Sequence, residues 1–214
     1  MSAGQWHAVP VRPRVPLSTT LTGPRLLLRP PQPSDVAELT MLYARNRKHR
    51  RSSKPASPPG IDPTSRDVVR AEVRRHRREW RDDEAYRFCV FEDGRAAGGI
   101  ALGGVQRGGF ANAYLGYWID VDRQGRGLMT EAVALVLDFA FGAAGLHRVQ
   151  VAVMPSNAAS RRVVAKAGFR EEGLALRYLE IDGRWEDHVL HAITAEEPRP
   201  GPRPGAGTPL VETE

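Results

Sequence analysis

Apolar and polar positions follow two different periods along the middle of this chain. Apolar residues spaced three and four apart predict helices, and alternation with aromatic or β-branched residues predicts strands. The predicted helices cover residues 34–46, 64–81, 127–144 and 157–167. The predicted strands cover residues 25–29, 86–91, 96–105, 112–121 and 147–154, then run from Phe169 through 178–181, and lastly over 188–193. Some of these strands are joined by tight turns and one pair by a long helix, which favours a mixed α/β (α+β) domain of three layers.

Turn and loop residues divide this pattern into one domain with two tails. Asp93-Gly94 and Asp182-Gly183 predict two-residue hairpin turns, and residues 54–62 (KPASPPGID) predict a loop. Residues 1–24 and 196–214 are rich in proline or glycine and lack periodicity, so we expect both to be flexible. The predicted domain is therefore 25–195.

Composition excludes several classes of protein. The sequence has 214 residues, 41% of them hydrophobic, and contains neither a long uncharged apolar run nor an apolar signal segment near its start. A single cysteine, Cys89, excludes an internal disulfide framework and a cysteine-rich metal site, and its place in a strand favours packing over a nucleophilic role. We expect a cytoplasmic protein without membrane association; its oligomeric state is not predicted.

The positive charge is concentrated in two segments. Lys+Arg 31 minus Asp+Glu 25 gives a net charge of +6, and cations cluster over residues 45–54 and 74–81. Such clusters are typical of a solvated surface, but they also suit an acidic partner such as the ribosome. A nucleic-acid-binding protein is one alternative, although the sequence shows no helix-turn-helix, zinc or RNP motif.

The most informative segment is the strand, glycine turn and helix start over residues 119–131. Gly125 and Gly127 allow backbone amides to approach a ligand, and the first helical turn leaves N–H groups unpaired, so we expect an anion site with Arg126 beside it. The segment is not a Walker loop, and Thr130 stands where a dinucleotide fingerprint needs its third glycine.

This turn resembles a known family. Gln124-Gly-Arg-Gly-Leu-Met129 is similar to the Q/R-x-x-G-x-G/A motif of the GNAT superfamily of acyl-CoA N-acyltransferases, with Met129 departing from the last position. Asn157-Ala-Ala-Ser160, Gly168-Phe169 and the closing hairpin over residues 178–188 resemble the ribosomal-protein-alanine N-acetyltransferase (RimJ-type) branch. The resemblance spans residues 25–194. It implies a GNAT fold, a central and mostly antiparallel sheet with helices on both faces.

The resemblance also implies a cosubstrate and roles for particular residues. Acetyl-CoA would be the acyl donor, and no metal would be needed. Backbone amides of the loop would hold the pyrophosphate of the cosubstrate, and the loop residues are Gln124, Gly125, Arg126, Gly127, Leu128, Met129 and Thr130. Groups of Ile119 and Val121 in the strand, and of Asn157 at the helix cap, would contact the pantetheine arm. Asn157 is equally suited to capping its helix. Ser160, one turn later, would contact the sulfur and help to protonate it. The alternative is that Ser160 lies on the helix surface without a catalytic role.

The sequence identifies the general base and the amine substrate less clearly than the site for the acyl donor. Glu180 is the candidate base, because it shares a strand face with Tyr178, although a surface carboxylate is the alternative. Tyr114 and Tyr117 are candidates for shaping the acceptor cleft. The branch implies a protein N-terminus as acceptor, but Lys54-Pro-Ala-Ser-Pro-Pro59 lacks the tryptophan usual there. A small amine or antibiotic, or a non-catalytic acyl-CoA-binding protein, therefore remains open.

Overall fold

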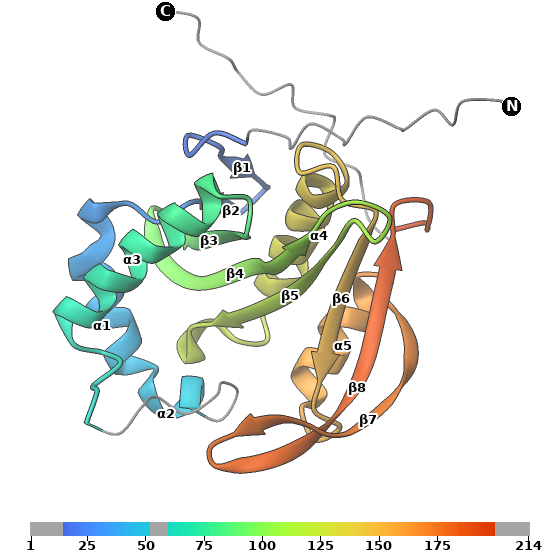
Figure 1. The fold of residues 1–214 in the computed structure, drawn as a ribbon. Helices are drawn as coiled ribbons and strands as arrows, with labels where there is room; N and C mark the ends of the chain where they lie inside the picture. Colours follow the sequence, from blue (N-terminus) through green and yellow to red (C-terminus); the bar gives the residue numbers. More distant parts are fainter. Residues whose placement is uncertain (1–14, 52–59, 200–214) are drawn as a thin grey trace, which may run out of the picture.

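The computed structural model describes residues 15–51 and 60–199, and these build one eight-stranded sheet (Figure 1). The strands lie in the order β1-β2-β3-β4-β5-β6-β8-β7. Their bounds are β1 Leu21–Thr22, β2 Leu26–Arg29, β3 Ala85–Glu92, β4 Arg95–Gln106, β5 Asn112–Ile119, β6 Arg148–Val153, β7 Arg170–Ile181 and β8 Arg184–Thr194. All neighbours are antiparallel except β5 and β6.

The helices are α1 Val36–Arg45, α2 Arg47–Arg51, α3 Arg66–Arg81, α4 Leu128–Phe141 and α5 Ala158–Lys166, with short 3-10 turns at Pro33–Asp35 and Val121–Arg123. α4 makes the crossover between the parallel strands β5 and β6, as a parallel pair requires. No helix among the described residues is long and apolar enough to cross a membrane.

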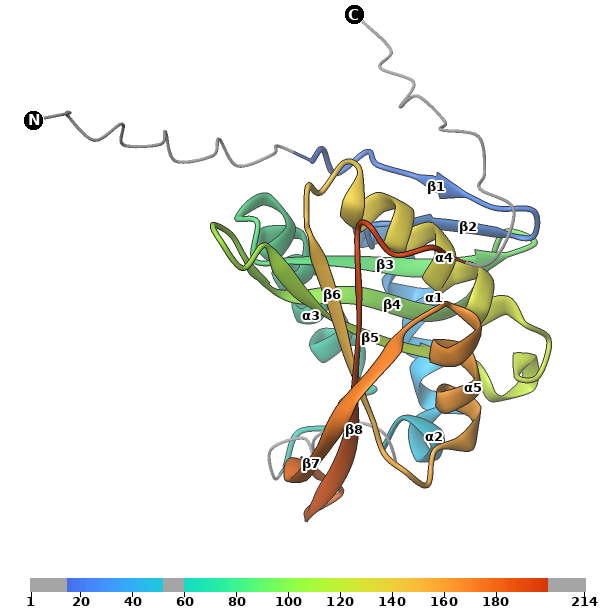
Figure 2. The ribbon, with the colours of Figure 1, turned by 90° about the vertical axis from the view of Figure 1, so that its right-hand side faces the viewer.

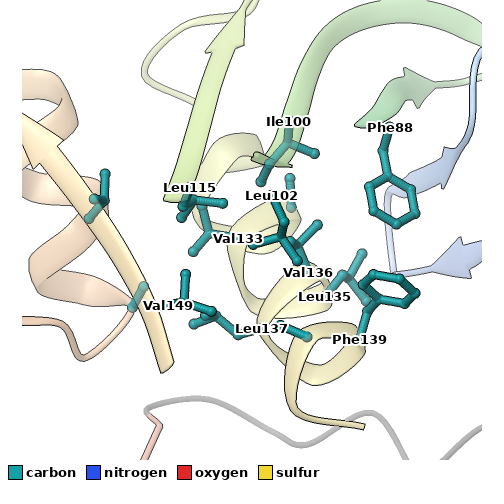
Figure 3. Close-up of a cluster of buried hydrophobic side chains, with 14 of the residues drawn as sticks. Phe88, Ile100, Leu102, Leu115, Val133, Leu135, Val136, Leu137, Phe139 and Val149 are labelled. Carbon is teal, nitrogen blue, oxygen red and sulfur yellow. The ribbon is translucent and has the colours of Figure 1, made fainter. Parts of the chain in front are cut away.

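Each face of the sheet packs on a different set of helices (Figure 2). Phe88 of β3 lies with α4 in the larger buried cluster, whereas its neighbour Cys89 lies with α1 and α3 in the smaller one. Alternate strand residues point to opposite faces, except where the β3–β4 register shifts between Val90 and Phe91, so that Ala96 and Ile100 of β4 lie in different clusters. Figure 3 shows the larger cluster, in which α4 supplies Val133, Val136 and Phe139.

The two parallel strands separate soon after they meet. β5 pairs with β6 through only three residue pairs, from Asn112 with Arg148 to Tyr114 with Gln150. Beyond that point β5 continues along β4 to Ile119, while β6 continues along β8 to Val153. The ribbon shows β5 and β6 diverging in this region (Figure 1). The second half of β5 therefore has a neighbouring strand on one side only.

The structure confirms the predicted fold class, the two hairpin turns and the helical crossover, and adds elements that the pattern did not predict. α2 and the two-residue β1 were not predicted. The expectation of a flexible tail over 1–24 is wrong for its second part, because Val15, Leu17 and Leu21 pack against the core and Val15 O accepts a hydrogen bond from Trp80. Residues 1–14, 52–59 and 200–214, which include most of the predicted loop and the C-terminal tail, lie outside the described residues.

Residues 196–199, assigned from sequence to the C-terminal tail, also contact the domain. Glu197 forms an ion pair with Arg170, and Arg199 one with Asp138. The folded part therefore ends later than the predicted boundary at 195.

Candidate active site

The glycine turn places an unpaired helix start beside the opened edge of β5. Gly125 and Gly127 have φ angles of +73° and +77°, a conformation that favours glycine. Gly127 is the N-cap of α4 without a side-chain cap, and the first helical bond runs from Glu131 N to Gly127 O. The N–H groups of Leu128, Met129 and Thr130 thus precede the first intrahelical bond. The side chains of Leu128 and Met129 are buried, so these two residues can offer a ligand only their backbone.

The charge of Arg126 is already paired. Its guanidinium donates to both carboxylate oxygens of Glu92, at 3.1 and 2.8 Å, and Arg123 donates to the same buried carboxylate. The backbone of Arg126 is fixed separately, because Arg25 donates to its carbonyl oxygen. The predicted anion site therefore rests on backbone N–H groups and the helix dipole more than on this arginine.

A buried asparagine ties the helical region to the end of β5. Asn46, 1% exposed, donates to Asp120 Oδ1 and accepts from Val121 N, each at 2.9 Å. Arg45 pairs with the other carboxylate oxygen of Asp120. Burial opposes ionisation, but hydrogen bonds from Asn46 and Arg45 outweigh it and hold the pKa of Asp120 below its usual value. Sequence reasoning missed this contact.

The two predicted strand residues differ in what they can offer to a pantetheine arm. Asp120 N donates to Ala97 O on β4, so by alternation the backbone groups of Ile119 point to the opposite edge, the one that β6 has left. Val121 N points elsewhere, to Asn46. Ile119 remains a prediction as a pantetheine contact, whereas the Val121 amide is already engaged. Gln124 of the loop bonds His49 through its side chain, at 2.9 Å.

Ser160 is joined to Tyr117 across the gap between the diverging strands. Tyr117, on β5, has its hydroxyl 2.7 Å from Ser160 Oγ, and also donates to the Ser160 carbonyl at 3.3 Å. Burial, opposed by the bond to Ser160, raises the pKa of Tyr117 to about 12. The phenol therefore keeps its proton at neutral pH. Asn157 Oδ1 accepts from Ser160 N at 3.0 Å, which makes Asn157 the cap of α5.

The remaining sequence candidates lie on the outer strands and on β5. Glu180 is an exposed residue of β7, opposite Trp185 of β8, and its role as a base stays a prediction. In the same hairpin Asp187 accepts a hydrogen bond from Arg177 N, and His188 packs against Tyr178, so both side chains stabilise the hairpin. Tyr114 is 43% exposed.

The environment of Cys89 makes its thiol unreactive. It is buried on β3, and burial raises the pKa of its thiol to about 12. The reactive species is the thiolate, which is negligible at pH 8 with such a pKa.

We therefore expect iodoacetamide at pH 8 to modify Cys89 at least about 100-fold more slowly in the native protein than in the urea-unfolded protein. Mass spectrometry of timed samples measures both rates. The same method should find no acetyl group on Cys89 after incubation with acetyl-CoA; an acetylated Cys89 would contradict direct transfer.

Two of the cavities on the described surface lie against the sheet. One, about 410 Å³, lies by β2 and the β3–β4 turn, and Arg29 and Asp35 in its lining form an ion pair with each other. The second, about 260 Å³, lies between the sheet and helices α1 and α3 and reaches Gly116, Tyr117 and Trp118 of β5. Only the second adjoins the opened strand. Among residues 15–51 and 60–199, no group of three or more His, Cys, Asp and Glu could hold a metal ion.

Similar proteins share both sequence and fold with this chain. It is 46% identical over 113 residues to the probable N-acetyltransferase YjcK of Bacillus subtilis, covering 52% of this chain and 62% of that protein. It is 40% identical over 119 residues to the ribosomal protein uS5-alanine N-acetyltransferase of Escherichia coli, covering 55% and 61%. The chain thus spans about three-fifths of the length of these curated relatives.

A solved structure matches over more of the chain. Mycobacterium smegmatis RimJ, in complex with CoA-disulfide, is similar with a TM-score of 0.77 and 37% identity, over 83% of this chain and 87% of that one. The acetyltransferase (GNAT) domain family matches residues 25–170, which include the glycine turn, the opened strand and Ser160. By this match the chain belongs to the GNAT acetyltransferase family.

Proposed function

We propose that this protein transfers the acetyl group of acetyl-CoA directly to a primary amine, and that the amine is the N-terminal amino group of a protein. The observation that carries the proposal is the glycine turn with its unpaired helix start, set beside the opened edge of β5 and the Tyr117–Ser160 contact. Support for the donor comes from the related RimJ structure, which is described as a complex with CoA-disulfide.

The proposed reaction needs no covalent enzyme intermediate. The amine nitrogen attacks the thioester carbonyl, the C–N bond forms and the C–S bond breaks. The amine loses one proton, and the departing thiolate gains one. The N–H of Ile119, pointing into the gap, would donate to the oxyanion, and Ser160 would donate its proton to the sulfur and be reprotonated from solvent. Tyr117, held protonated, orients the Ser160 hydroxyl.

The proposed identity of the acceptor rests on the names of related proteins. The Escherichia coli relative is named as acting on an alanine of ribosomal protein uS5. An α-amino group has a pKa of about 8 and is partly neutral at physiological pH, so a strong base is not required. Glu180, or a water molecule, would receive the proton.

We expect Ser160→Ala to lower kcat by roughly 100-fold while changing the affinity for acetyl-CoA little, because only the proton donor to sulfur is lost. The cap of α5 survives, since Asn157 bonds the backbone of residue 160. Tyr117→Phe should lower kcat less, about 3- to 10-fold, because it removes only the orienting bond. Steady-state kinetics with separate donor titrations measures both. Equal losses in kcat and donor affinity would assign Ser160 to binding instead.

The function itself is tested by a thermal shift with acetyl-CoA, followed by free-thiol release with a panel of amines. The panel contains peptides that start with alanine or serine, polyamines, amino acids and aminoglycosides. Stabilisation is expected because the donor binds only the folded state. Thiol release with the peptides supports the N-terminal acceptor. Release with small amines alone would keep the reaction and change the acceptor, and binding without release would favour an acyl-CoA-binding protein.

A further inference from the structure

The cavity between the sheet and helices α1 and α3 is lined in part by small strand residues, Gly98, Gly99, Ala101 and Gly116. Trp118 packs with the α1 and α3 cluster, so alternation places Gly116 on this same face of β5, next to Ala101 of β4. A Cβ atom built on Gly116 would meet no other atom within 4 Å. The cavity therefore exists because small residues occupy strand positions where a larger side chain would find room.

The cavity side of β5 lies back to back with the proposed reaction centre. Gly116 and Trp118 flank Tyr117, whose side chain leaves the other face of β5 to reach Ser160. The strand that would otherwise cover this edge, β6, has already diverged. A group seated over Gly116 can thus reach the edge of β5 from the side opposite to α4 and α5.

One carboxylate of this cavity, Glu72, has no hydrogen-bond or ion-pair partner among the side chains that the structure describes. Arg75 and Arg87, which also line it, both form ion pairs with Glu79. Glu72 is half-buried, and no residue in 15–50 or 60–199 forms a hydrogen bond or ion pair with its side chain. Glu72 interacts electrostatically with Arg50, whose guanidinium stacks over Tyr43 at 3.6 Å from the ring centre. Tyr43, His76 and Cys89 are further titratable residues in the lining of the cavity.

We propose that this cavity receives the acceptor, that Glu72 binds the acceptor's ammonium group, and that the open space over Gly116 restricts acceptors to those with a slender amine end. The bound ammonium group releases one proton to water before its nitrogen attacks, and the second proton leaves as in the proposed transfer. The inference rests on the proposed acetyl transfer and names the substrate class of that site. Partly buried carboxylates bind cations more strongly than exposed ones, because water screens the charge less. The cavity, about 260 Å³, has room for a small first residue such as alanine or serine.

The test compares two peptides with the full-length protein in the presence of CoA. One is Ala-Gly-Ser-Gly-Tyr amide, and the other is its des-amino analogue, in which propionyl replaces alanine. Isothermal titration calorimetry should show at least tenfold tighter binding of the amine peptide by the unaltered protein. In Glu72→Gln this preference should fall to about twofold or less, and Glu72→Asp should restore part of it.

Kinetics gives a second readout. Glu72→Gln should raise KM for the peptide at least tenfold, leaving kcat within about threefold and acetyl-CoA affinity unchanged. Asp67→Asn is the matched control: it removes one negative charge from the same helix, α3, at a side chain that is 90% exposed, and should change nothing.

Gly116→Val tests the open space over Gly116 independently of charge. Because a Cβ has room there and the residue lies in a strand, the variant should keep its melting temperature and its donor affinity, while peptide KM rises at least tenfold. Gly103→Val, on β4 and outside the cavity, is the control.

The outcomes separate the two proposals. If the unaltered protein releases thiol but Glu72→Gln keeps the preference for the amine peptide, or Gly116→Val keeps the peptide KM, this inference is overturned and the proposed function stands. If the unaltered protein binds no acetyl-CoA and releases no thiol with any amine, the proposed function fails.

Discussion

Replacing Gly127 by aspartate should weaken acetyl-CoA binding by roughly 30- to 150-fold. The new carboxylate would stand at the N-cap of α4, where backbone N–H groups would otherwise face the pyrophosphate. Two like charges about 5 Å apart in a partly solvated site repel by about 2–3 kcal/mol, which is the stated change in Kd. Isothermal titration calorimetry with CoA measures it.

Gly127→Asn is the control for this variant. Asparagine has the same shape as aspartate, tolerates the left-handed conformation of residue 127 (φ +77°) and carries no charge. Its affinity for CoA should stay within a fewfold of the unaltered protein. Aspartate is a favourable N-cap residue and the built Cβ lies no nearer than 3.7 Å to Arg25 Nη2, so both variants should fold. Equal affinities for Asn and Asp would mean that no anion binds at this turn.

Asn46→Leu should destabilise the protein by about 3 kcal/mol, a fall in melting temperature of about 6–12 °C. Leucine fills the same space but removes a donor to the Asp120 carboxylate and the acceptor for Val121 N, leaving buried polar groups unpaired. Differential scanning calorimetry at pH 7 measures the change. Because the folded pKa of Asp120 is lowered, this stabilisation is present above the usual aspartate pKa and is lost as pH falls through the lowered value.

Arg45→Gln is the matched control, since it removes the other partner of Asp120. The Arg45 side chain is 53% exposed, so water and the new Gln side chain can replace much of its bond to the Asp120 carboxylate, which is itself 1% exposed. We therefore expect a melting temperature close to that of the unaltered protein. A loss as large as that of Asn46→Leu would show that the ion pair, and not the buried amide, fixes the end of β5.

Sequence predicted the parts of the site that depend on neighbouring residues. The glycine turn was predicted from one short segment, as a place where backbone amides can approach a ligand, and both of its glycines adopt the left-handed conformation that favours glycine. Asn157 caps α5 by bonding the amide three positions later, another local rule. The hairpins at Asp93 and Asp182 followed for the same reason.

Contacts between distant segments could not be predicted in this way. Arg126 is paired with Glu92, which is 34 positions away, and Tyr117 contacts Ser160, 43 positions away. Each partner is an ordinary residue in its own segment, so neither composition nor spacing identifies the pair. The cavity was missed for a similar reason, because Gly116 and Glu72 become neighbours of one space only when α3 packs on the sheet.

The divergence of β5 and β6 also has a consequence for solubility. Unpaired strand edges invite pairing with other chains, and most proteins confine them to the outer rim of a sheet. Here the separation creates two such edges inside the sheet, at the second half of β5 and along β6. In the proposed reaction this is where the donor's pantetheine arm would lie. Bound acetyl-CoA would thus cover the inner strand edges. When the concentration of acetyl-CoA is low, these edges would be exposed, and the protein would aggregate more readily as well as lose its activity.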